Sequence, residues 1–179
     1  MLGEGAAFLV VESEEHAKER GAEILARVAG YGQTTDTFHL TQPSQDGKPL
    51  ELAMRRALEE ASLSPSQIGY VNAHGTGTPF NDGAEAKAFA AVFEGQSTRL
   101  SSTKSAIGHT LGAAGSIEAL ICIKTLETGK LPPQINLQDP EPLVSEALVR
   151  MGECVDLQAV MSVNLGFGGS NAALLLTKP

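Results

Sequence analysis

Cysteine, tryptophan and long apolar runs are scarce or absent in this sequence of 179 residues. It contains no tryptophan and only two cysteines, Cys122 and Cys154. Two isolated thiols do not make a disulfide framework, so we expect a reducing compartment, the cytoplasm. No apolar run approaches the ~18 residues of a membrane span, and no basic region precedes an apolar stretch at the start. We therefore expect neither a membrane span nor a signal peptide.

Positive charge is also in short supply. Lysine and arginine number 13 against 21 aspartates and glutamates, which gives a formal net charge of −8. Nucleic acids and anionic membranes bind basic surfaces, so we expect neither as a partner. Hydrophobic residues make up 42% of the chain, more than a disordered segment carries, and no repeat or linker interrupts it. We expect one globular domain over residues 1–179.

The sequence signatures of several common sites are missing. The chain has no G-x-x-x-x-G-K-[ST] loop for nucleotide phosphates and no G-x-S-x-G turn carrying a nucleophilic serine. His74 and His109 lack the spacing of zinc ligands and have no cysteine nearby, so no metal site is expected. Cys122 lies in an apolar stretch and is interpreted as inert packing. Cys154 is a weak candidate nucleophile, because nothing near it would stabilise a thiolate.

Strand-like and helix-like segments alternate along the chain. Short runs rich in valine, leucine and isoleucine predict strands at Gly5–Glu12, Ile24–Tyr31, Ile68–Ala73, Arg99–Thr103, Val160–Leu165 and Ala172–Thr177. Such alternation predicts a layered α/β fold with a mostly parallel sheet. The last two strands are joined by a short glycine turn, so we expect them to be antiparallel neighbours.

Helical periodicity marks the segments between the strands. The predicted helices are Ser13–Arg20, Pro49–Ala61, Asp82–Phe93 and Gly112–Thr128. Ser13 is a plausible N-cap of the first helix, and Gly21 follows its end. The segment Gly112–Thr128 is apolar nearly all round, which predicts a helix buried in the core. Gly32–Lys48 is polar and Leu131–Pro142 is rich in proline, so both are predicted to be irregular.

The segment Val71–Pro79 brings reactive side chains to the end of a predicted strand. The strand runs into His74, and a Gly-Thr-Gly-Thr turn follows. Sheets of α/β proteins place reactive groups at strand ends, and glycines let a ligand approach the backbone. Thr76 and Thr78 would offer such a ligand their hydroxyl groups. The plainer alternative is a histidine satisfied by hydrogen bonds at a tight turn.

The segment Ser101–Gly115 carries Lys104 and His109 just before the apolar helix. A helix N-terminus favours neutral imidazole, which can donate a hydrogen bond to an enolate or another oxyanion. Lys104 lies among small residues beside a core helix, so we expect a buried ion pair instead of a solvated lysine. Asp82 and Glu85, on one face of the preceding helix, are its expected partners.

The segment Asn164–Asn171 places Gly-Phe-Gly-Gly between the last two predicted strands. Because these glycines join two strands and do not open a helix, the segment is not a dinucleotide-binding fingerprint. The segment is either a plain tight hairpin or a functional turn that carries a mobile aromatic residue, Phe167. In the second case the flanking glycines permit unusual backbone angles. The two remaining histidines, His16 and His39, are interpreted as surface residues.

Together these motifs resemble the β-ketoacyl-acyl-carrier-protein synthases of the thiolase-like condensing-enzyme family. Three motifs match, and they occur in the same order as in the family. The first is His74–Thr78, and the third is Gly166–Asn171. The second combines Lys104, Gly108–His109 and Gly112–Gly115. The likeness runs from Leu2 to about Lys178 and is nearest to bacterial elongating enzymes and type II polyketide ketosynthases. It covers only the C-terminal half of the family. It therefore implies an α/β thiolase-like half domain with a five-stranded mixed sheet.

The resemblance implies an activity and a set of catalytic residues. The activity is the decarboxylative Claisen condensation of acyl and malonyl thioesters in fatty-acid or polyketide synthesis. His74 and His109 match the two catalytic histidines of the family. Lys104 matches its buried lysine, and Asp82 and Glu85 match the acidic surroundings of that lysine.

The resemblance also implies how substrates and partners bind. Thr76 and Thr78 match residues that hydrogen-bond the phosphopantetheine arm. Phe167 matches a gating phenylalanine whose N–H contributes to the oxyanion hole, and Leu165 stands where an aromatic residue is more usual. No metal or organic cofactor is implied, because decarboxylation needs only charge stabilisation and orientation. The expected partners are acyl carrier protein, the N-terminal half of the synthase and further copies of the chain in a homo-oligomer.

The nucleophilic cysteine of the family belongs to the half that the resemblance does not cover. Neither Cys122 nor Cys154 lies in a matching motif, and we expect the chain to begin inside a strand that closely follows the first half. The 179 residues alone are therefore expected to lack condensing activity. One alternative is a non-catalytic subunit like the chain-length factors, although such a subunit has no chemical need of His74, Lys104 and His109. Another is a thiolase acting on coenzyme A esters, which the Gly-Thr-Gly-Thr turn fits less well.

Overall fold

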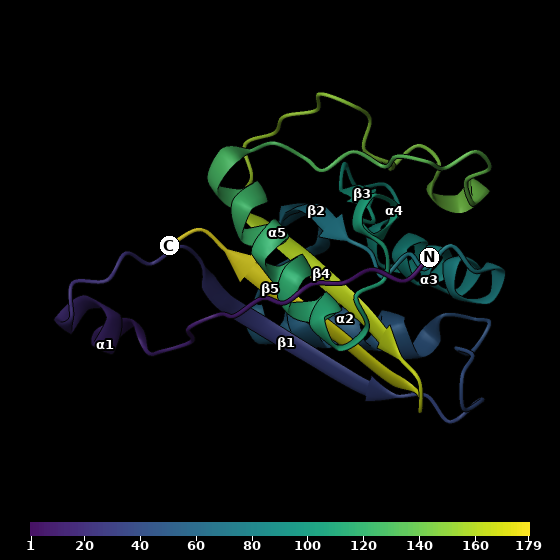
Figure 1. Ribbon diagram of the computed structural model, residues 1–179, viewed down its shortest axis with the longest axis horizontal. Coiled ribbons are helices and arrows are strands. Elements are labelled where there is room, and N and C mark those ends of the chain that lie inside the picture. The colour runs from purple at the N-terminus through teal and green to yellow at the C-terminus, as the bar shows by residue number, and fades with distance from the viewer.

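The computed structural model describes all 179 residues and is built around one five-stranded sheet (Figure 1). The strands are β1 (Arg27–Thr35), β2 (Ile68–Asn72), β3 (Arg99–Ser101), β4 (Ala159–Gly166) and β5 (Ser170–Thr177). The α-helices are α1 (Glu14–Glu19), α2 (Lys48–Ala61), α3 (Pro79–Phe93), α4 (Lys104–Ile107) and α5 (Ala114–Thr128). Short 3-10 turns lie at Pro65–Gln67, Leu111–Ala113 and Pro142–Val144. None of the helices has the length and apolar character needed to cross a membrane.

The sheet is mixed, as predicted, and its strand order is β1-β5-β4-β2-β3. β2 runs parallel to both of its neighbours, β3 and β4. β4 and β5 form the predicted antiparallel hairpin, and β1 pairs antiparallel with β5. Parallel strands end at the same edge of a sheet, where α/β proteins bind their ligands. The three sequence motifs follow β2, β3 and β4, so the topology brings them to one end of the molecule.

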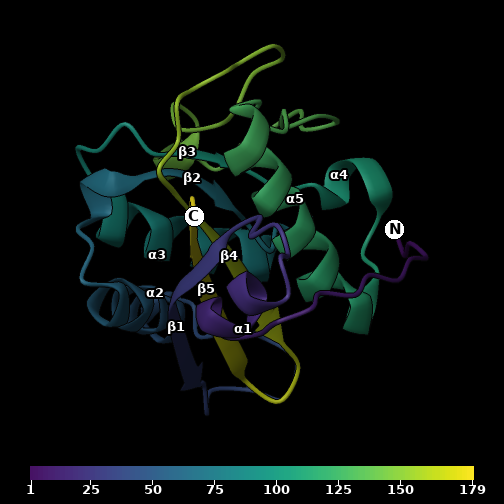
Figure 2. The same cartoon turned by 90° about the vertical axis from the view of Figure 1, so that its left-hand side faces the viewer.

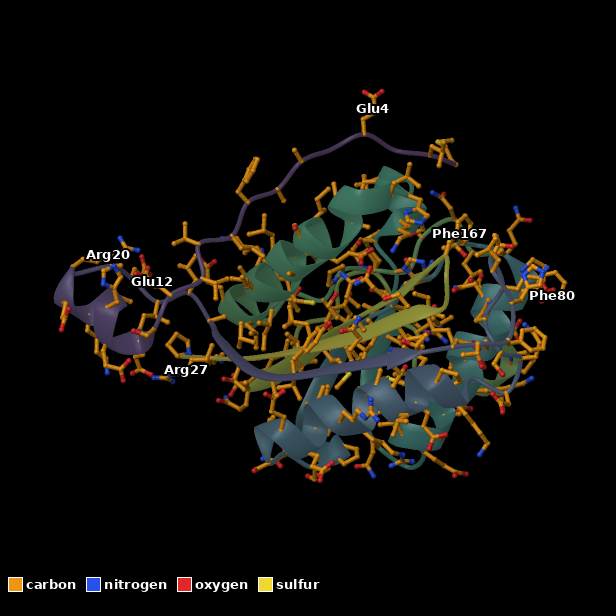
Figure 3. The ribbon with its side chains drawn as sticks, turned by 90° about the horizontal axis from the view of Figure 1, so that it is seen from below. Glu4, Glu12, Arg20, Arg27, Phe80 and Phe167 are labelled. Carbon is orange, nitrogen blue, oxygen red and sulfur yellow. The ribbon has the colours of Figure 1, made fainter.

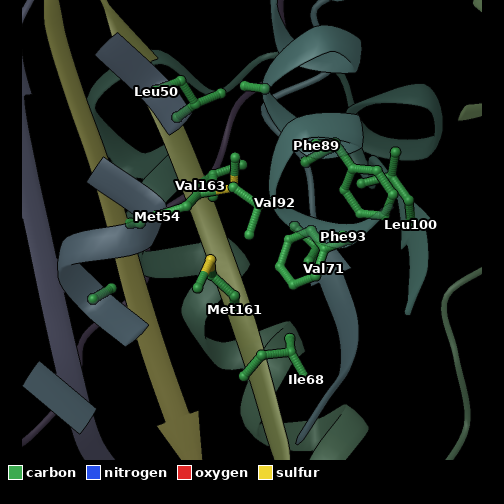
Figure 4. Close-up of a cluster of buried hydrophobic side chains, with 14 of the residues drawn as sticks. Leu50, Met54, Ile68, Val71, Phe89, Val92, Phe93, Leu100, Met161 and Val163 are labelled. Atoms are coloured by element: carbon green, nitrogen blue, oxygen red, sulfur yellow. The ribbon is translucent and has the colours of Figure 1, made fainter. Parts of the chain in front are cut away.

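Helices cover both faces of the sheet (Figure 2). α2 and α3 lie on one face, where Leu50, Met54 and Phe89 belong to a cluster of 20 buried apolar residues (Figure 4). The apolar face predicted for α2 is the face that it buries. α5 lies on the opposite face, over a cluster of eight buried residues that includes Tyr70 and Cys122. The sheet is therefore the middle layer of three.

Helix α5 was predicted to be buried on all sides, and this prediction is wrong for its outer face. Only one face of the helix packs on the sheet, and Leu120 on the other side is exposed. The packed face contains Ala119 and Cys122 together with two polar residues, Glu118 and Thr125. An apolar pattern predicts that a helix surface will be covered but does not say by what. No helix or strand of this chain covers the outer face of α5.

The segment Gly5–Glu12 was predicted to be a strand, and that prediction is wrong. The segment is extended and runs along the outside of α5, but it pairs with no strand (Figure 1). Phe8 is 90% exposed, and Val10 and Val11 are exposed with it. A strand needs a neighbour for its backbone N–H and C=O groups, and this chain supplies none for these residues. The apolar pattern therefore did not determine a strand here, because strand formation also needs a pairing neighbour.

Helix α1 is confirmed and lies beside the sheet, away from its core (Figure 3). Ser13 caps it by accepting a hydrogen bond from the backbone N–H of His16. Ion pairs at the surface join Glu12 to Arg20 and Glu14 to Arg27. Surface ion pairs contribute little to stability, so these contacts add little to the attachment of α1.

Strand β1 begins and ends later than the predicted segment 24–31. It continues to Thr35 because β5 supplies pairing partners as far as Ser170. Gly32 and the polar residues after it are typical of a loop, but cross-strand pairing overrides that local preference. Gly32 also lets α2 pack closely, since a Cβ added there would lie 1.8 Å from the carbonyl oxygen of Ala53.

Replacing Gly32 with alanine is expected to lower the free energy of unfolding by about 2–3 kcal/mol, because α2 would have to move away from β1. Gly115 provides the control: it lies in α5, and the nearest atom to an added Cβ is 4.0 Å away. Alanine at Gly115 is expected to be neutral or to stabilise by up to about 1 kcal/mol. Urea denaturation measures both changes. An unchanged midpoint for G32A would contradict the close packing of α2 on β1.

Candidate functional site

The residues predicted to form the site line two adjacent cavities at one end of the sheet. The larger cavity has a volume of about 930 Å³, and five predicted residues line it, namely His74, Thr76, Thr78, His109 and Phe167. The second cavity has a volume of about 710 Å³ and is lined by Lys104, Asp82 and Glu85, together with Thr76 and Thr78. The turn that carries the two threonines therefore separates the imidazoles from the charged side chains behind it.

The two histidines converge at the larger cavity. His74 is the second residue after β2 and is 6% exposed. The centroid of its ring lies 5.3 Å from that of His109, and the two ring planes meet at 89°. His109 lies between α4 and α5, where its backbone pairs with the first residues of the chain, Met1 and Gly3. The predicted convergence of the imidazoles is confirmed.

Both imidazoles are neutral near pH 7. Burial is the largest of the causes that lower the pKa of His74 to about 3, and the charges of Lys104 and His109 act in the same direction. Burial and the charge of Lys104 also lower the pKa of His109. The Nδ1 atom of His109 accepts the backbone N–H of Leu111 at 3.2 Å, which assigns the ring proton to Nε2. Burial and the charge of Lys104 therefore both favour the expected neutral form.

Acidification is expected to destabilise the protein through His74. Its pKa is about 3 in the folded protein against 6.5 for an ordinary histidine, so the unfolded state binds a proton first. The stabilising contribution is complete above pH 6.5 and is lost as the pH falls from 6.5 toward 3. Replacing His74 with asparagine removes the titrating group and should flatten the pH dependence of the unfolding free energy in this window. Urea titrations across that range measure the slope, and equal slopes for the two proteins would contradict a buried neutral His74.

Lys104 is buried and paired, as predicted, but its partner is Glu118. The predicted pairing with Glu85 or Asp82 is wrong. The Nζ atom of Lys104 donates to the Glu118 carboxylate, and the two side chains are 4% and 2% exposed. Glu118 projects from the packed face of α5. Glu118 stands among apolar residues of α5, and the sequence pattern does not show that its side chain faces inward.

Glu85 orders the turn that follows His74. Its carboxylate oxygens accept the backbone N–H groups of His74 at 2.6 Å and Gly75 at 2.8 Å. The side chain of Asn81 donates to the same carboxylate at 3.3 Å and to Asp82 at 3.0 Å. Burial raises the pKa of Glu85 to about 7, against the lowering effect of the two backbone hydrogen bonds. Glu85 thus fixes the backbone of His74 and does not pair with the lysine.

The turn between β4 and β5 has the unusual backbone that its glycines suggested. Phe167 is 82% exposed at the open end of the sheet, where Phe80 also projects (Figure 3). Gly168 and Gly169 after it have φ angles of 79° and 82°, a region that favours glycine. On the facing turn, the hydroxyl oxygens of Thr76 and Thr78 lie 2.9 Å apart.

The loop after β1 contributes to the site, although the sequence predicted only a polar surface loop. His39 and Leu40 line the larger cavity. The carbonyl of Leu40 accepts the N–H of Gly168 at 2.7 Å, and the N–H of Asp36 donates to the carbonyl of Gly169 at 2.7 Å. The loop therefore supports the turn that carries Phe167. Residues 36–43 carry no local pattern that could have revealed this contact.

Asn164 is a further site residue, which the sequence identified only as the first residue of a motif. It lines the larger cavity near the end of β4. Its side chain lies close enough to His74 and Glu118 to raise the pKa of the first and lower that of the second. Nearby, Asn72 and Ser162 have buried side chains without a hydrogen-bond partner. Polar groups are thus concentrated where the parallel strands end.

Neither cysteine lines the larger cavity. Cys122 lies on the buried face of α5, and burial raises the pKa of its thiol well above the usual range. Cys154 is exposed. The structure contains no group of three or more histidine, cysteine, aspartate or glutamate side chains placed to hold a metal ion. The site therefore offers two neutral imidazoles, hydroxyl groups and backbone amides, without a thiolate.

Comparisons with known proteins point to one family. The family model described as β-ketoacyl synthase, C-terminal domain, matches residues 25–138. The mitochondrial 3-oxoacyl-[acyl-carrier-protein] synthase of Arabidopsis thaliana is 44% identical over 98% of this chain and 39% of its own length. The 3-oxoacyl-[acyl-carrier-protein] synthase 2 of Vibrio harveyi is 44% identical over 99% of this chain and 44% of its own. The chain thus spans about two fifths of the length of these curated relatives.

Solved structures agree with the sequence relatives. The ishigamide ketosynthase/chain length factor matches with a TM-score of 0.93 and 36% identity, over 100% of this chain and 44% of that one. A β-ketoacyl synthase from Burkholderia phymatum STM815 matches with a TM-score of 0.86 and 39% identity, over 94% of this chain and 41% of that one. These likenesses confirm the expected thiolase-like half domain.

Proposed function

The chain belongs to the family of β-ketoacyl synthase C-terminal domains, and we therefore propose that it acts as the histidine-bearing half of a 3-oxoacyl-acyl-carrier-protein synthase. The proposed reaction is the decarboxylative Claisen condensation of an acyl thioester with a malonyl thioester. One observation carries the proposal: two neutral imidazoles lie 5.3 Å apart in a cavity that Phe167 and two threonine hydroxyl groups also line.

In the proposed mechanism the imidazoles stabilise negative charge where it develops. Loss of CO₂ from the malonyl group leaves an enolate, and hydrogen bonds from His74 and His109 stabilise its oxygen. Because the pKa of His74 is about 3, its ring stays neutral and does not quench the carbanion by proton transfer. The carbanion attacks the carbonyl carbon of the acyl thioester, the new C–C bond forms, and the enzyme's cysteine leaves as a thiolate.

The other site residues have supporting roles in this proposal. Lys104 with Glu118, and Glu85 with the backbone of His74, hold the imidazoles in place before substrate arrives. The hydroxyl groups of Thr76 and Thr78 bind the phosphopantetheine arm, and Phe167 gates the entrance. The reaction as proposed needs no metal or organic cofactor, because decarboxylation of a malonyl thioester requires only charge stabilisation and orientation.

The acyl-bearing cysteine is proposed to come from the N-terminal half of the synthase. A reactive thiolate needs an accessible and electropositive setting. Burial raises the pKa of the Cys122 thiol, and Cys154 lies outside the cavity lining. The 179 residues alone thus provide enolate stabilisation without a nucleophile.

Uncovered apolar surface supports the other half as a partner. Phe8, Val10 and Val11 are exposed along the extended N-terminal segment, and Leu120 is exposed on α5. Exposed apolar patches mark sites of protein contact. Acyl carrier protein is the proposed carrier of both substrates, in line with a similar structure described as an acyl-carrier protein in complex with its ketosynthase. A homo-oligomer and a cytoplasmic location remain part of the proposal, although one relative is mitochondrial by name.

A non-catalytic subunit like the chain-length factors is the second candidate. Two similar structures are described as a ketosynthase with a chain length factor. Such a subunit would bind a complete ketosynthase and would tolerate the loss of either imidazole. The catalytic proposal requires both.

A chimeric synthase tests the proposal. It joins the N-terminal part of the Vibrio harveyi relative, which this chain does not match, to the 179 residues in one polypeptide. The chimeric synthase is expected to form a 3-oxoacyl product from acyl and malonyl carrier-protein thioesters, whereas the 179 residues alone form none. A folded chimeric synthase that takes up the acyl group but never condenses it would contradict the catalytic proposal and favour the chain-length-factor alternative.

A further inference from the structure

The first three residues of the chain, Met1–Gly3, lie beside His109, although no motif of the site includes them. The segment crosses the outside of α5 to reach the end of α4 (Figure 1). The N–H of His109 donates to the C=O of Met1 at 3.0 Å, and the N–H of Gly3 donates to the C=O of His109 at 3.0 Å. Leu2 and His109 thus form a parallel bridge. Both polar groups of the His109 backbone are bonded to this segment.

The chain on either side of His109 is irregular. Gly108, before it, has a φ angle of 79°, and Leu111, after it, has a φ angle of 52°. A left-handed backbone costs free energy at a residue with a side chain and persists where surrounding contacts fix it. The N–H of Leu111 is the group that donates to Nδ1 of His109. No helix or strand contains His109, so its backbone hydrogen bonds run to Met1 and Gly3 instead.

Two glycines allow the segment to come this close. A Cβ added at Gly3 would lie 2.2 Å from the carbonyl oxygen of Ile107, and one at Gly108 would lie 2.8 Å from the backbone nitrogen of Gly3. Both contacts are with backbone atoms, which cannot rotate away as a side chain can. A side chain at Gly3 would therefore push Met1–Gly3 away from the end of α4 and break its bridge to His109.

We propose that Met1–Gly3 is a positioning element for the imidazole of His109. The bridge holds the His109 backbone so that Nδ1 meets the N–H of Leu111 and the ring proton stays on Nε2. The inference rests on the proposed function, in which His109 donates a hydrogen bond to the enolate oxygen. Gly3 acts through His109 and touches no reacting atom, so it is a positioning residue and not a catalytic one.

Nuclear magnetic resonance of the His109 ring nitrogens in the 179-residue chain tests the positioning. In the parent protein one nitrogen is expected to show the signal of an acceptor and the other that of a protonated nitrogen, because one tautomer dominates. In Gly3→Ala the two signals are expected to move toward each other as the tautomers mix. The pKa of His109, which burial and Lys104 lower, is expected to rise toward the ordinary value of 6.5.

Two control variants separate positioning from a general loss of stability. Gly5→Ala lies in the same segment, but the atom nearest to its added Cβ is Cδ1 of Ile117 at 2.8 Å, the end of a flexible side chain. Gly32→Ala disturbs the packing of α2, on the face of the sheet opposite α5. Both controls should keep the parental His109 signals.

Parental signals in Gly3→Ala would overturn the inference, and so would an equal change in Gly32→Ala, which would show only that the variant is less stable. If Gly3→Ala does not fold, a chain without Met1–Gly3 carries the same comparison of tautomers, because it removes the bridge without introducing a clash.

The chimeric synthase links the positioning of His109 to catalysis. Gly3→Ala in this protein is expected to lower kcat for condensation by about 10–10²-fold, the effect of a small misplacement of a catalytic group, while acyl uptake persists. Gly5→Ala should condense at the parental rate. The two experiments fail in different ways. Unchanged His109 signals overturn the inference whatever the chimeric synthase does, whereas changed signals with a parental kcat contradict the role of His109 in the proposed function.

Discussion

Replacing Glu118 with alanine is expected to lower the free energy of unfolding by about 3–5 kcal/mol, because Lys104 would be left as a buried, unpaired charge. The Lys104 side chain is 4% exposed, and its Nζ atom donates to no other carboxylate. Glu127→Ala is the matched control, since Glu127 forms an exposed ion pair with Lys124 on the same helix. The Glu127→Ala substitution is expected to lower the free energy of unfolding by no more than about 1 kcal/mol. Urea denaturation measures both variants.

A double variant separates the loss of the ion pair from a general disturbance of α5. Lys104→Met with Glu118→Leu replaces the pair by apolar side chains and is expected to recover most of the lost stability. A loss below about 1 kcal/mol for Glu118→Ala alone would contradict a buried pair, because an exposed ion pair changes stability by about that much. It would show that Lys104 reaches water or another partner.

Replacing His74 with alanine in the chimeric synthase is expected to lower kcat for condensation by about 10²–10³, the effect of removing one oxyanion donor. Uptake of the acyl group is expected to persist, because that step uses the cysteine nucleophile and forms no enolate. His16→Ala is the control, since His16 lies exposed on α1. Steady-state assays measure kcat, and mass spectrometry of the protein measures acyl uptake.

His109→Ala tests whether the two imidazoles act on one oxyanion. Each single variant should lose a similar factor in kcat, and the double variant should lose less than the product of the two, because residues that act as a unit are not additive. A His74→Ala variant that condenses at the parental rate would contradict the proposed role of the imidazole. It would leave the chain-length-factor alternative as the better account.

The main site residues could be located from the sequence because local features determine their positions. An apolar strand ends two residues before His74, and a glycine turn between two strands carries Phe167. Parallel strands end at one edge of the sheet, so the segments that follow them must meet. The order of the motifs and the class of fold therefore followed from periodicity, turn residues and a general rule of topology.

Other features depend on contacts between distant segments, and the local pattern does not contain them. Glu118 lies among apolar residues in a helix that could face either way, so no local pattern favoured it over Glu85 as the partner of Lys104. The residues after Gly32 extend β1 only because β5 lies beside them. The apolar segment Gly5–Glu12 has the pattern of a strand, but the pattern does not say which sheet the strand joins.

Intact-protein mass spectrometry after incubation with an acyl carrier-protein thioester tests the central claim most directly. The claim is that this chain stabilises the enolate and takes its nucleophile from another part of the synthase. The 179 residues alone are predicted to gain no acyl mass at Cys122 or Cys154, whereas the chimeric synthase gains one acyl group on its N-terminal part. Stoichiometric acylation of either cysteine in the 179-residue chain, followed by a 3-oxoacyl product when malonyl carrier protein is added, would contradict the claim.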